Sequence, residues 1–114
     1  MNYTIINRDQ LPPGENSHEF QGVLYQDTEV SFIWVDMAPG GVVRLHQHPY
    51  PEIFIVLEGV PTFTVDGDTL EGQAGQIILI HANVPHKFVN RSDQQLRQID
   101  IHVAKQFITH WLED

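Results

Sequence analysis

The chain has 114 residues, a length that fits one domain and leaves no room for a second hydrophobic core. Apolar residues make up 41% of the sequence and charged residues 18%, which is typical of a globular domain rather than a disordered chain. Six Lys and Arg residues against 15 Asp and Glu residues give a formal charge of −9. This charge repels nucleic acids and anionic membranes, so we expect neither as a partner.

Cysteine is absent, which excludes disulfides, thiolate nucleophiles and Cys-ligated zinc. Any metal site must therefore use histidine and carboxylate ligands. Residues 1–14 lack the basic start and long apolar run of a signal peptide, and no stretch of 18 uncharged apolar residues occurs. We therefore expect a cytoplasmic protein.

The first part of the chain, residues 1–28, is expected to form an N-terminal arm, because Pro12-Pro13-Gly14 rules out a regular helix and favours a turn. A single domain then spans residues 29–114. Its apolar runs are short, bounded by turns and rich in β-branched and aromatic residues, which predicts strands in an antiparallel sandwich or barrel. The runs cover residues 30–37, 42–45, 53–57, 61–65, 76–80, 86–89 and 96–103.

Two local patterns add detail to this reading. Asp66-Gly67 stands between two alternating runs and predicts a tight β-hairpin. The tail alone has helical spacing, with apolar residues on one stripe, and predicts a short C-terminal helix packed against the barrel. The stripe consists of Phe107, Ile108, Trp111 and Leu112.

Three histidines and one glutamate form a candidate metal site. His46 and His48 are two residues apart, so on a strand both imidazoles project from one face, which Arg44 shares. Glu52 follows a rigid Pro-Tyr-Pro corner that can fold it back beside them, and His86 starts a later strand. Three imidazoles and one carboxylate suit Mn, Fe, Co, Ni or Zn and disfavour Ca or Mg. Taken alone, however, a His-x-His pair in a strand is more often only a pair of surface or core histidines.

The spacing of two blocks makes the metal reading more specific. The first block contains, at intervals of five, one, three and six residues, Gly40, His46, His48, Glu52 and Gly59. The second contains, at intervals of five, one, two and three residues, Gly75, His81, Asn83, His86 and Asn90. These blocks resemble the two sequence motifs of the cupin superfamily, with the short spacer of its small single-domain members. His81 and Asn83 stand where the family usually has Pro and Gly, and Asn tolerates the left-handed backbone that such a turn needs.

The resemblance implies an all-β fold, an antiparallel β-jelly-roll barrel that binds one divalent transition metal (Fe, Mn, Ni, Zn or Co). The ligands that it implies are His46, His48, Glu52 and His86. Because small cupins commonly pair through their sheets, it also implies a homodimer. Cupins include enzymes and non-catalytic binding domains, so the fold cannot choose among them.

Two functions follow from this reading. The first is a metal-dependent enzyme, an oxidoreductase of the dioxygenase type or an isomerase or lyase, acting on a small oxygenated or acidic molecule. The alternative is a non-catalytic binding or sensing module that holds its ligand through the metal. The candidates for substrate binding are Arg44, Phe54 and His102.

Each of these candidates also has an ordinary structural reading. Arg44 could grip a substrate carboxylate or be ion-paired within the barrel. Phe54 could belong to the cavity wall or simply to the core. His102 alternates with apolar neighbours on the last long run, where it shares a polar face with Gln98 and Asp100. That face either lines the cavity or faces solvent.

Overall fold

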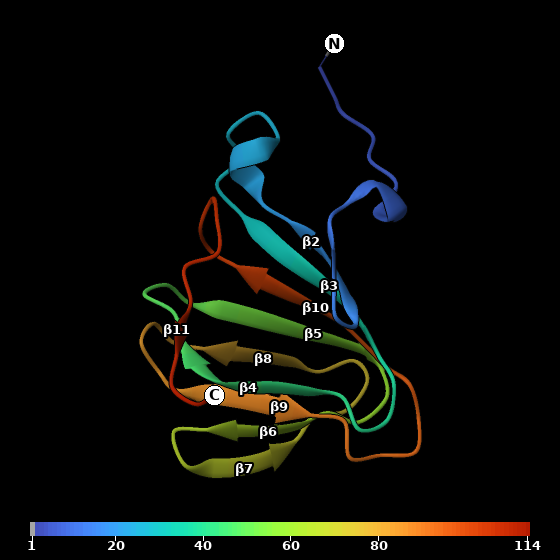
Figure 1. Ribbon diagram of the computed structural model, residues 1–114, viewed down its shortest axis with the longest axis vertical. Helices are drawn as coiled ribbons and strands as arrows, with labels where there is room; N and C mark the ends of the chain where they lie inside the picture. The colour runs from blue at the N-terminus through green and yellow to red at the C-terminus, as the bar shows by residue number, and fades with distance from the viewer. Residues whose placement is uncertain (1) are drawn as a thin grey trace.

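The computed structural model describes residues 2–114 and is built almost entirely of β-strands (Figure 1). The strands form two antiparallel sheets, one of six strands in the order β1-β2-β3-β10-β5-β8 and one of five in the order β11-β4-β9-β6-β7. The sheets lie as two layers whose inward side chains meet in the core. The all-β antiparallel jelly roll predicted from the sequence is thus confirmed, as two facing sheets.

The strands and two short 3-10 helices have the following bounds. In chain order they are η1 Arg8–Gln10, β1 Pro13–Gly14, β2 Ser17–Phe20, η2 Gly22–Leu24, β3 Ser31–Met37, β4 Val42–Gln47, β5 Glu52–Glu58, β6 Thr62–Val65, β7 Asp68–Glu71, β8 Ile77–Ile80, β9 His86–Val89, β10 Leu96–His102 and β11 His110–Trp111. Within residues 2–114, no helix has the length and apolar character needed to cross a membrane.

The predicted turns have the backbone that their residues favour. Asp66 and Gly67 both have positive φ, 49° and 86°, and connect β6 to β7 in an antiparallel hairpin with Val65 opposite Asp68. Positive φ at both positions is the requirement of a two-residue type I′ turn. Asn83 also adopts a positive φ of 65°, so asparagine takes over the conformation that glycine usually provides at this site.

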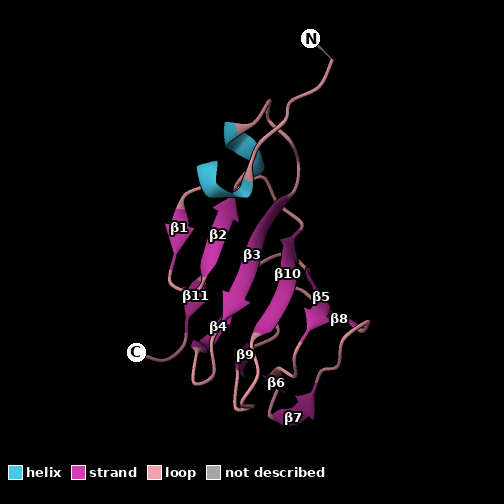
Figure 2. Ribbon diagram, turned by 90° about the vertical axis from the view of Figure 1, so that its right-hand side faces the viewer, coloured by secondary structure: helices cyan, strands magenta, loops and turns pink. Residues whose placement is uncertain are grey.

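The N-terminal segment contributes strands to the larger sheet. Strand β2 pairs with β3 in antiparallel register from Ser17 opposite Val35 to Phe20 opposite Phe32, and β1 pairs with β2. The ring of Phe20 stacks on Phe32 at 4.8 Å and on Tyr25 at 4.7 Å. Part of the segment is therefore packed against the domain (Figure 2). The division of the chain after residue 28 stays a prediction.

The predicted C-terminal helix is wrong. Residues 110–111 form strand β11 instead, with His110 opposite Gln47 and Trp111 opposite His46 on β4. The exposed edge of β4 takes up backbone hydrogen bonds that a helix would have satisfied internally, and the Leu112 N–H donates to the Leu45 carbonyl at 2.9 Å. The side chains of the tail follow the two-residue period of a strand and not the helical period. Phe107, Thr109 and Trp111, each two residues apart, all line one cavity.

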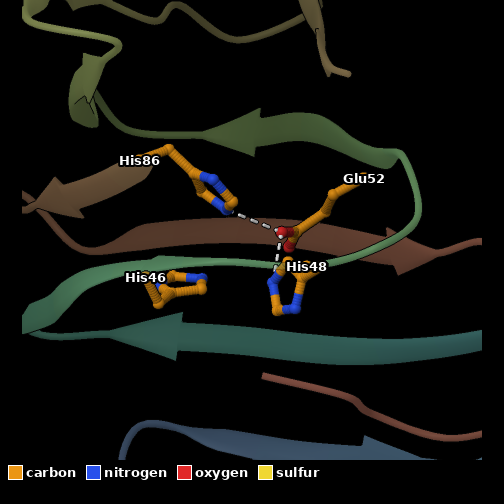
Figure 3. Close-up of side chains that lie close together, drawn as sticks. All are labelled: His46, His48, Glu52 and His86. Atoms are coloured by element: carbon orange, nitrogen blue, oxygen red, sulfur yellow. Dashed lines mark hydrogen bonds and ion pairs between the residues drawn. The ribbon is translucent and has the colours of Figure 1, made fainter. Parts of the chain in front are cut away.

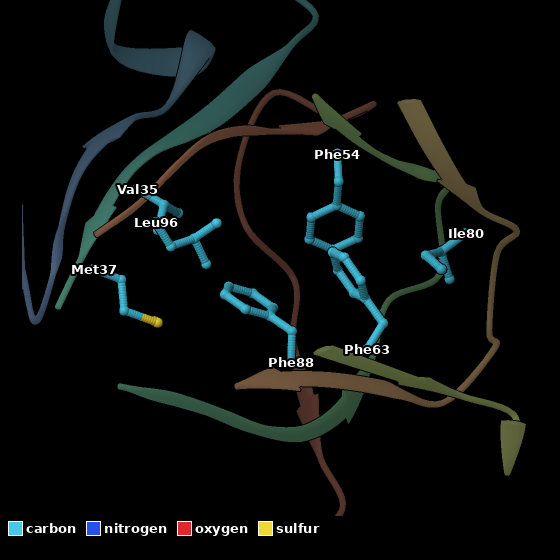
Figure 4. Close-up of a cluster of buried hydrophobic side chains, with 7 residues drawn as sticks. All are labelled: Val35, Met37, Phe54, Phe63, Ile80, Phe88 and Leu96. Atoms are coloured by element: carbon cyan, nitrogen blue, oxygen red, sulfur yellow. The ribbon is translucent and has the colours of Figure 1, made fainter. Parts of the chain in front are cut away.

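Buried apolar side chains from both sheets fill the space between them (Figure 4). The cluster consists of Val35, Met37, Phe54, Phe63, Ile80, Phe88 and Leu96. Three phenylalanine rings form its centre, with the Phe54 centroid 5.0 Å from Phe63 and 5.9 Å from Phe88. The side chains of the candidate metal site are not members of this cluster and lie beside it.

Candidate metal centre

The fold brings the four predicted ligands together (Figure 3). His46 lies in β4, His48 just beyond its end, Glu52 at the start of β5 and His86 at the start of β9. Each offers one ligand atom, all four atoms lie within 4.8 Å of one another, and all four residues are buried. The sequence-based grouping of these residues is therefore confirmed as a cluster that could hold a metal ion.

The three histidines share one orientation. In each, Nδ1 lies against a backbone carbonyl, which can only accept a hydrogen bond, so Nδ1 carries the hydrogen and donates it. A neutral imidazole held in this way presents the lone pair of Nε2 at its other end. The carbonyls are those of Arg44 for His46 (2.6 Å), Ile108 for His48 (2.8 Å) and Val84 for His86 (2.9 Å).

The donor set fits a divalent transition metal. Oε1 of Glu52 lies 2.9 Å from Nε2 of His86 and 3.1 Å from Nε2 of His48. The His48 Nε2 atom is buried and has no hydrogen-bond partner among residues 2–114. Lone pairs of neutral imidazoles beside a carboxylate repel one another, and a cation among them removes this repulsion. Three nitrogens and one oxygen are the ligands that Mn, Fe, Co, Ni or Zn accept.

The environment favours the protonation states that metal ligands need. Burial lowers the pKa of His46 to about 4, although the hydrogen bond to the Arg44 carbonyl acts in the opposite direction. Burial by itself would raise the pKa of Glu52, but hydrogen bonding from the side chains around it, that of His102 first, outweighs this effect and holds the pKa well below its usual value. His46 is therefore neutral and Glu52 ionised at neutral pH, as metal ligation requires.

A cavity of about 400 Å³ adjoins the cluster. His46, His48 and Glu52 form part of its wall. Strands β3 and β4 add apolar side chains, among them Ile33 and Val35, and the C-terminal segment adds a further apolar wall. The arrangement combines a polar, metal-binding end with a largely apolar body, as small-molecule sites commonly do.

The three predicted substrate residues fall in different places. Arg44 lines the cavity but is exposed, with its guanidinium carbon 4.9 Å from the ring centroid of Trp111. His102 lines the cavity and is buried. Phe54 is buried in the hydrophobic core and is not among the residues that form the cavity wall.

The polar face of β10 points inward. Gln98, Asp100 and His102 are 0%, 3% and 2% exposed, so of the two alternatives left open by the sequence the structure has the buried one. Gln98 Nε2 donates to Asp100 Oδ1 at 2.8 Å. Burial and the nearby charge of Glu52 raise the pKa of Asp100 well above its usual value. These effects favour the protonated, uncharged form of Asp100, whose side chain lies in the wall of the cavity.

The residues of the site that were not predicted include Tyr50, Phe107, Thr109 and Trp111. Tyr50 lies between the two prolines of the corner, where the sequence indicated only a rigid turn, and its hydroxyl contacts His102 at 2.6 Å. Trp111 packs against His46 with ring centroids 5.0 Å apart. The alternation at 107, 109 and 111 was the available signal, and the helical stripe concealed it.

Asp100→Asn is expected to stabilise the chelator-treated protein at neutral pH. The unfolded chain ionises Asp100 above pH 3.8, whereas the folded protein keeps it protonated, so stability is lost as the pH rises above 3.8. Asparagine can still accept from Gln98 and carries no such cost. Urea unfolding should show a gain at neutral pH that disappears towards pH 3.8, and an equal gain at both would contradict the neutral carboxyl.

Comparisons with known proteins agree with this structure. The family model described as a cupin domain matches residues 33–102. A polyketide synthase, CurC of Streptomyces cyaneus, is 36% identical over 64 residues, which is 55% of this chain and 42% of that protein. The chain thus spans less than half the length of this relative.

Solved structures of oxalate decarboxylase have the same fold. One of the Bacillus subtilis enzyme, studied for its Mn(II) centres, matches with a TM-score of 0.79 and 23% identity over 91% of this chain and 30% of that one. The Lactobacillus farciminis enzyme in complex with formate matches with a TM-score of 0.80 and 22% identity over 91% of this chain and 34% of that one. From the family match over more than half of its residues, together with the jelly roll and the four clustered ligands, we conclude that this chain belongs to the cupin domain family.

Proposed function

We propose that this protein is a metal-dependent enzyme that acts on a small oxygenated or acidic organic molecule. His46, His48, Glu52 and His86 would hold one divalent transition metal. The observation that carries the proposal is the convergence of three imidazoles and one carboxylate beside a cavity of about 400 Å³, whose wall includes His46, His48 and Glu52. A metal bound there supplies Lewis-acid chemistry and, if it is redox-active, electron transfer at the oxygen atoms of a substrate.

The other residues of the cavity have distinct tasks in this proposal. Phe107 and Trp111 cover the histidines and keep bulk water from them, since the ring of Trp111 lies against His46 and that of Phe107 against His102. The side chains of Ile33 and Val35 contact the carbon skeleton of the substrate. Asp100, as a neutral acid, can donate a hydrogen bond to a substrate oxygen.

Two reaction types are compatible with the residues of this site. Dioxygenase and isomerase or lyase chemistry both use a metal with open positions for an oxygenated substrate. The oxalate decarboxylases support the fold alone, and the relative named as a polyketide synthase is compatible with a small organic substrate. A cytoplasmic location stays a prediction.

One experiment separates the enzyme from a binding module. Protein purified without added metal is analysed for its metal content and then screened with enediols, β-diketones and small acids for oxygen consumption and for new products by NMR. Metal-dependent conversion of one class supports the proposal. Saturable binding without conversion would favour the sensing module, and protein that takes up no divalent metal would contradict both.

Arg44→Met is expected to weaken the binding of small acids roughly 2- to 5-fold while leaving their neutral amides unaffected, because an ion pair to an exposed guanidinium contributes about 0.5–1 kcal/mol. Within residues 2–114 the Arg44 guanidinium forms no ion pair, whereas Asp36 pairs with Arg97 at 3.5 Å. Calorimetric titration with acid and amide pairs checks this. A lower melting temperature with unchanged acid binding would make Arg44 a structural residue.

The outer face of the six-stranded sheet supports the proposed homodimer. Apolar side chains stand opposite one another across four strands, in the rows Leu79, Ile53, Ile101, Phe32 and Ile77, Ile55, Ile99, Trp34. Ile77 and Leu79 are 69% and 53% exposed. A continuous apolar face of this kind is rare on a monomer and suits a second copy of the chain. Light scattering should give the dimer mass for the parent and the monomer mass for Leu79→Lys, and a monomeric parent would contradict the proposal.

A further inference from the structure

We propose that Tyr50 and His102 are positioning residues for the carboxylate of Glu52. His102 would hold the Oε2 atom, so that the Oε1 atom faces the three histidines. The inference rests on the metal site proposed above. His102 is close enough to the cluster to be mistaken for a fifth ligand, and its hydrogen-bond partners decide between the two roles.

The hydroxyl of Tyr50 determines which nitrogen of His102 carries the hydrogen. It accepts the Ile108 N–H at 3.2 Å and lies 2.6 Å from His102 Nδ1. A tyrosine phenol ordinarily loses its hydrogen only at a pH of about 10, so at neutral pH the hydroxyl of Tyr50 keeps it. A phenol has one hydrogen to donate, and Nδ1 is the acceptor beside it. His102 therefore accepts at Nδ1 and carries its own hydrogen at Nε2.

This tautomer is the opposite of that in the three proposed ligands. His46, His48 and His86 each donate from Nδ1 to a carbonyl and present a lone pair at Nε2. His102 presents an N–H at Nε2 instead, and an N–H cannot coordinate a metal. It can, however, donate to a carboxylate.

Glu52 is the carboxylate within reach. His102 Nε2 lies 3.1 Å from Oε2, whereas Oε1 lies 2.9 Å from His86 and 3.1 Å from His48. The two oxygens thus face different groups. At 3.1 Å the two atoms are within hydrogen-bond distance, but the structure does not align them as a hydrogen bond, and the buried Nε2 atom has no partner among residues 2–114. Glu52 Oε2 is thus the acceptor that the inference assigns to this N–H.

The surroundings leave His102 little freedom. It stands directly opposite Glu52 in the β10–β5 register, which fixes the separation of the two backbones. The rings of His48 and Phe107 pack on it edge to face, with centroids at 4.6 Å and 4.8 Å. A residue held in this way can orient a ligand, and such orientation typically affects metal affinity by roughly 10- to 100-fold.

The tautomer can be observed directly. In ¹⁵N-labelled protein loaded with Zn(II) as a diamagnetic probe, long-range ¹H–¹⁵N correlation spectra distinguish the two neutral imidazole forms. We expect His102 in the Nε2–H form and His46, His48 and His86 in the Nδ1–H form. In Tyr50→Phe, His102 should populate the Nδ1–H form as well. A His102 in the Nδ1–H form in the parent, as a fifth ligand would be, overturns the inference.

Metal affinity provides the second readout. His102→Leu removes the donor and is expected to weaken Zn(II) binding by roughly 10- to 100-fold in competition with a chelating dye. His102→Gln places an amide N–H where Nε2 stood and should restore most of this loss. Tyr50→Phe should weaken Zn(II) binding by less than about 10-fold, because His102 can then adopt either tautomer but its ring still has an N–H to donate. The control is His81→Leu, an exposed histidine, which should bind like the parent.

The outcomes separate this inference from the proposed function. If the parent binds Zn(II) and His102→Leu binds it equally well, the positioning role is wrong and the metal site stands. If His102→Gln binds as weakly as His102→Leu, the ring nitrogen itself is a ligand and the inference is also wrong. A parent without affinity for Zn(II) would overturn both proposals. Should His102→Leu fail to fold by circular dichroism, His102→Gln and the tautomer in Tyr50→Phe decide.

Discussion

Replacing His48 or His86 with alanine is expected to abolish stoichiometric metal binding while the jelly roll stays folded. Each change removes one of the four metal ligands. The expected loss of metal affinity is therefore larger than the roughly 10- to 100-fold loss caused by mutating residues that only orient a ligand. The hydrophobic core between the sheets is formed by other side chains, with the ring of His86 at its edge against Phe54. Elemental analysis after dialysis measures the metal, and circular dichroism measures the fold.

His81→Ala is the matched control, because His81 belongs to the second sequence block but is exposed and outside the cluster. It should retain the metal content of the parent. Full occupancy in both His48→Ala and His86→Ala would show that the proposed site is wrong. Unfolding of both variants in the presence of excess metal would show instead that the histidines are required for the fold.

Acidification is expected to destabilise the chelator-treated protein over the window from pH 6.5 to about 4, through His46. Its pKa is 6.5 in the unfolded chain and about 4 in the folded one, so in this window the unfolded chain binds the extra proton. The contribution of His46 to stability is therefore constant above pH 6.5 and is lost as the pH drops below it. The loss through this one group reaches about 3 kcal/mol near pH 4.

Two carboxyl groups modify this slope. Glu52 has a lowered pKa, so its contribution is present above 4.5 and is lost as the pH falls through its folded value, which adds to the acid sensitivity. Asp100 has a raised pKa and acts in the opposite sense above 3.8. The slope of the parent is therefore smaller than that of Asp100→Asn.

Urea unfolding at several pH values measures how much of the pH dependence of the free energy of unfolding is due to His46. His46→Gln should lose this share of the pH dependence, whereas His81→Gln should keep it. An unchanged slope in His46→Gln would contradict the role of its burial. With metal present, protons compete for the same ligands, and retention of metal at pH 4 against a chelator would contradict three histidine ligands.

The strands and the ligand set could be predicted from the sequence because both depend on local chemistry. Alternation over 96–103 and the Asp66-Gly67 pair determine strand and turn through backbone preferences that act within a few residues. The spacing of His46, His48 and Glu52 around a proline corner restricts where those side chains can go, which is why their grouping with His86 is confirmed.

The tail shows where local pattern misleads. Phe107, Ile108, Trp111 and Leu112 have the spacing of an amphipathic helix, yet the segment pairs with β4. The deciding factor is the open edge of β4, whose backbone groups need hydrogen-bond partners. The presence of that edge cannot be deduced from residues 105–114 themselves. Long-range pairing therefore overrode the local preference.

The sequence by itself determined the strand pattern, the turns and the four clustered ligands. Only the tertiary structure decided that Gln98, Asp100 and His102 face inward, that Phe54 belongs to the core, and that Tyr50 contacts His102 across 52 positions of the chain. An alternating strand has two faces, and which one is buried depends on the sheet that packs against it. Hydrogen-bond direction likewise depends on partners brought together only by the fold, so the roles of the residues behind the ligands could not be read from spacing.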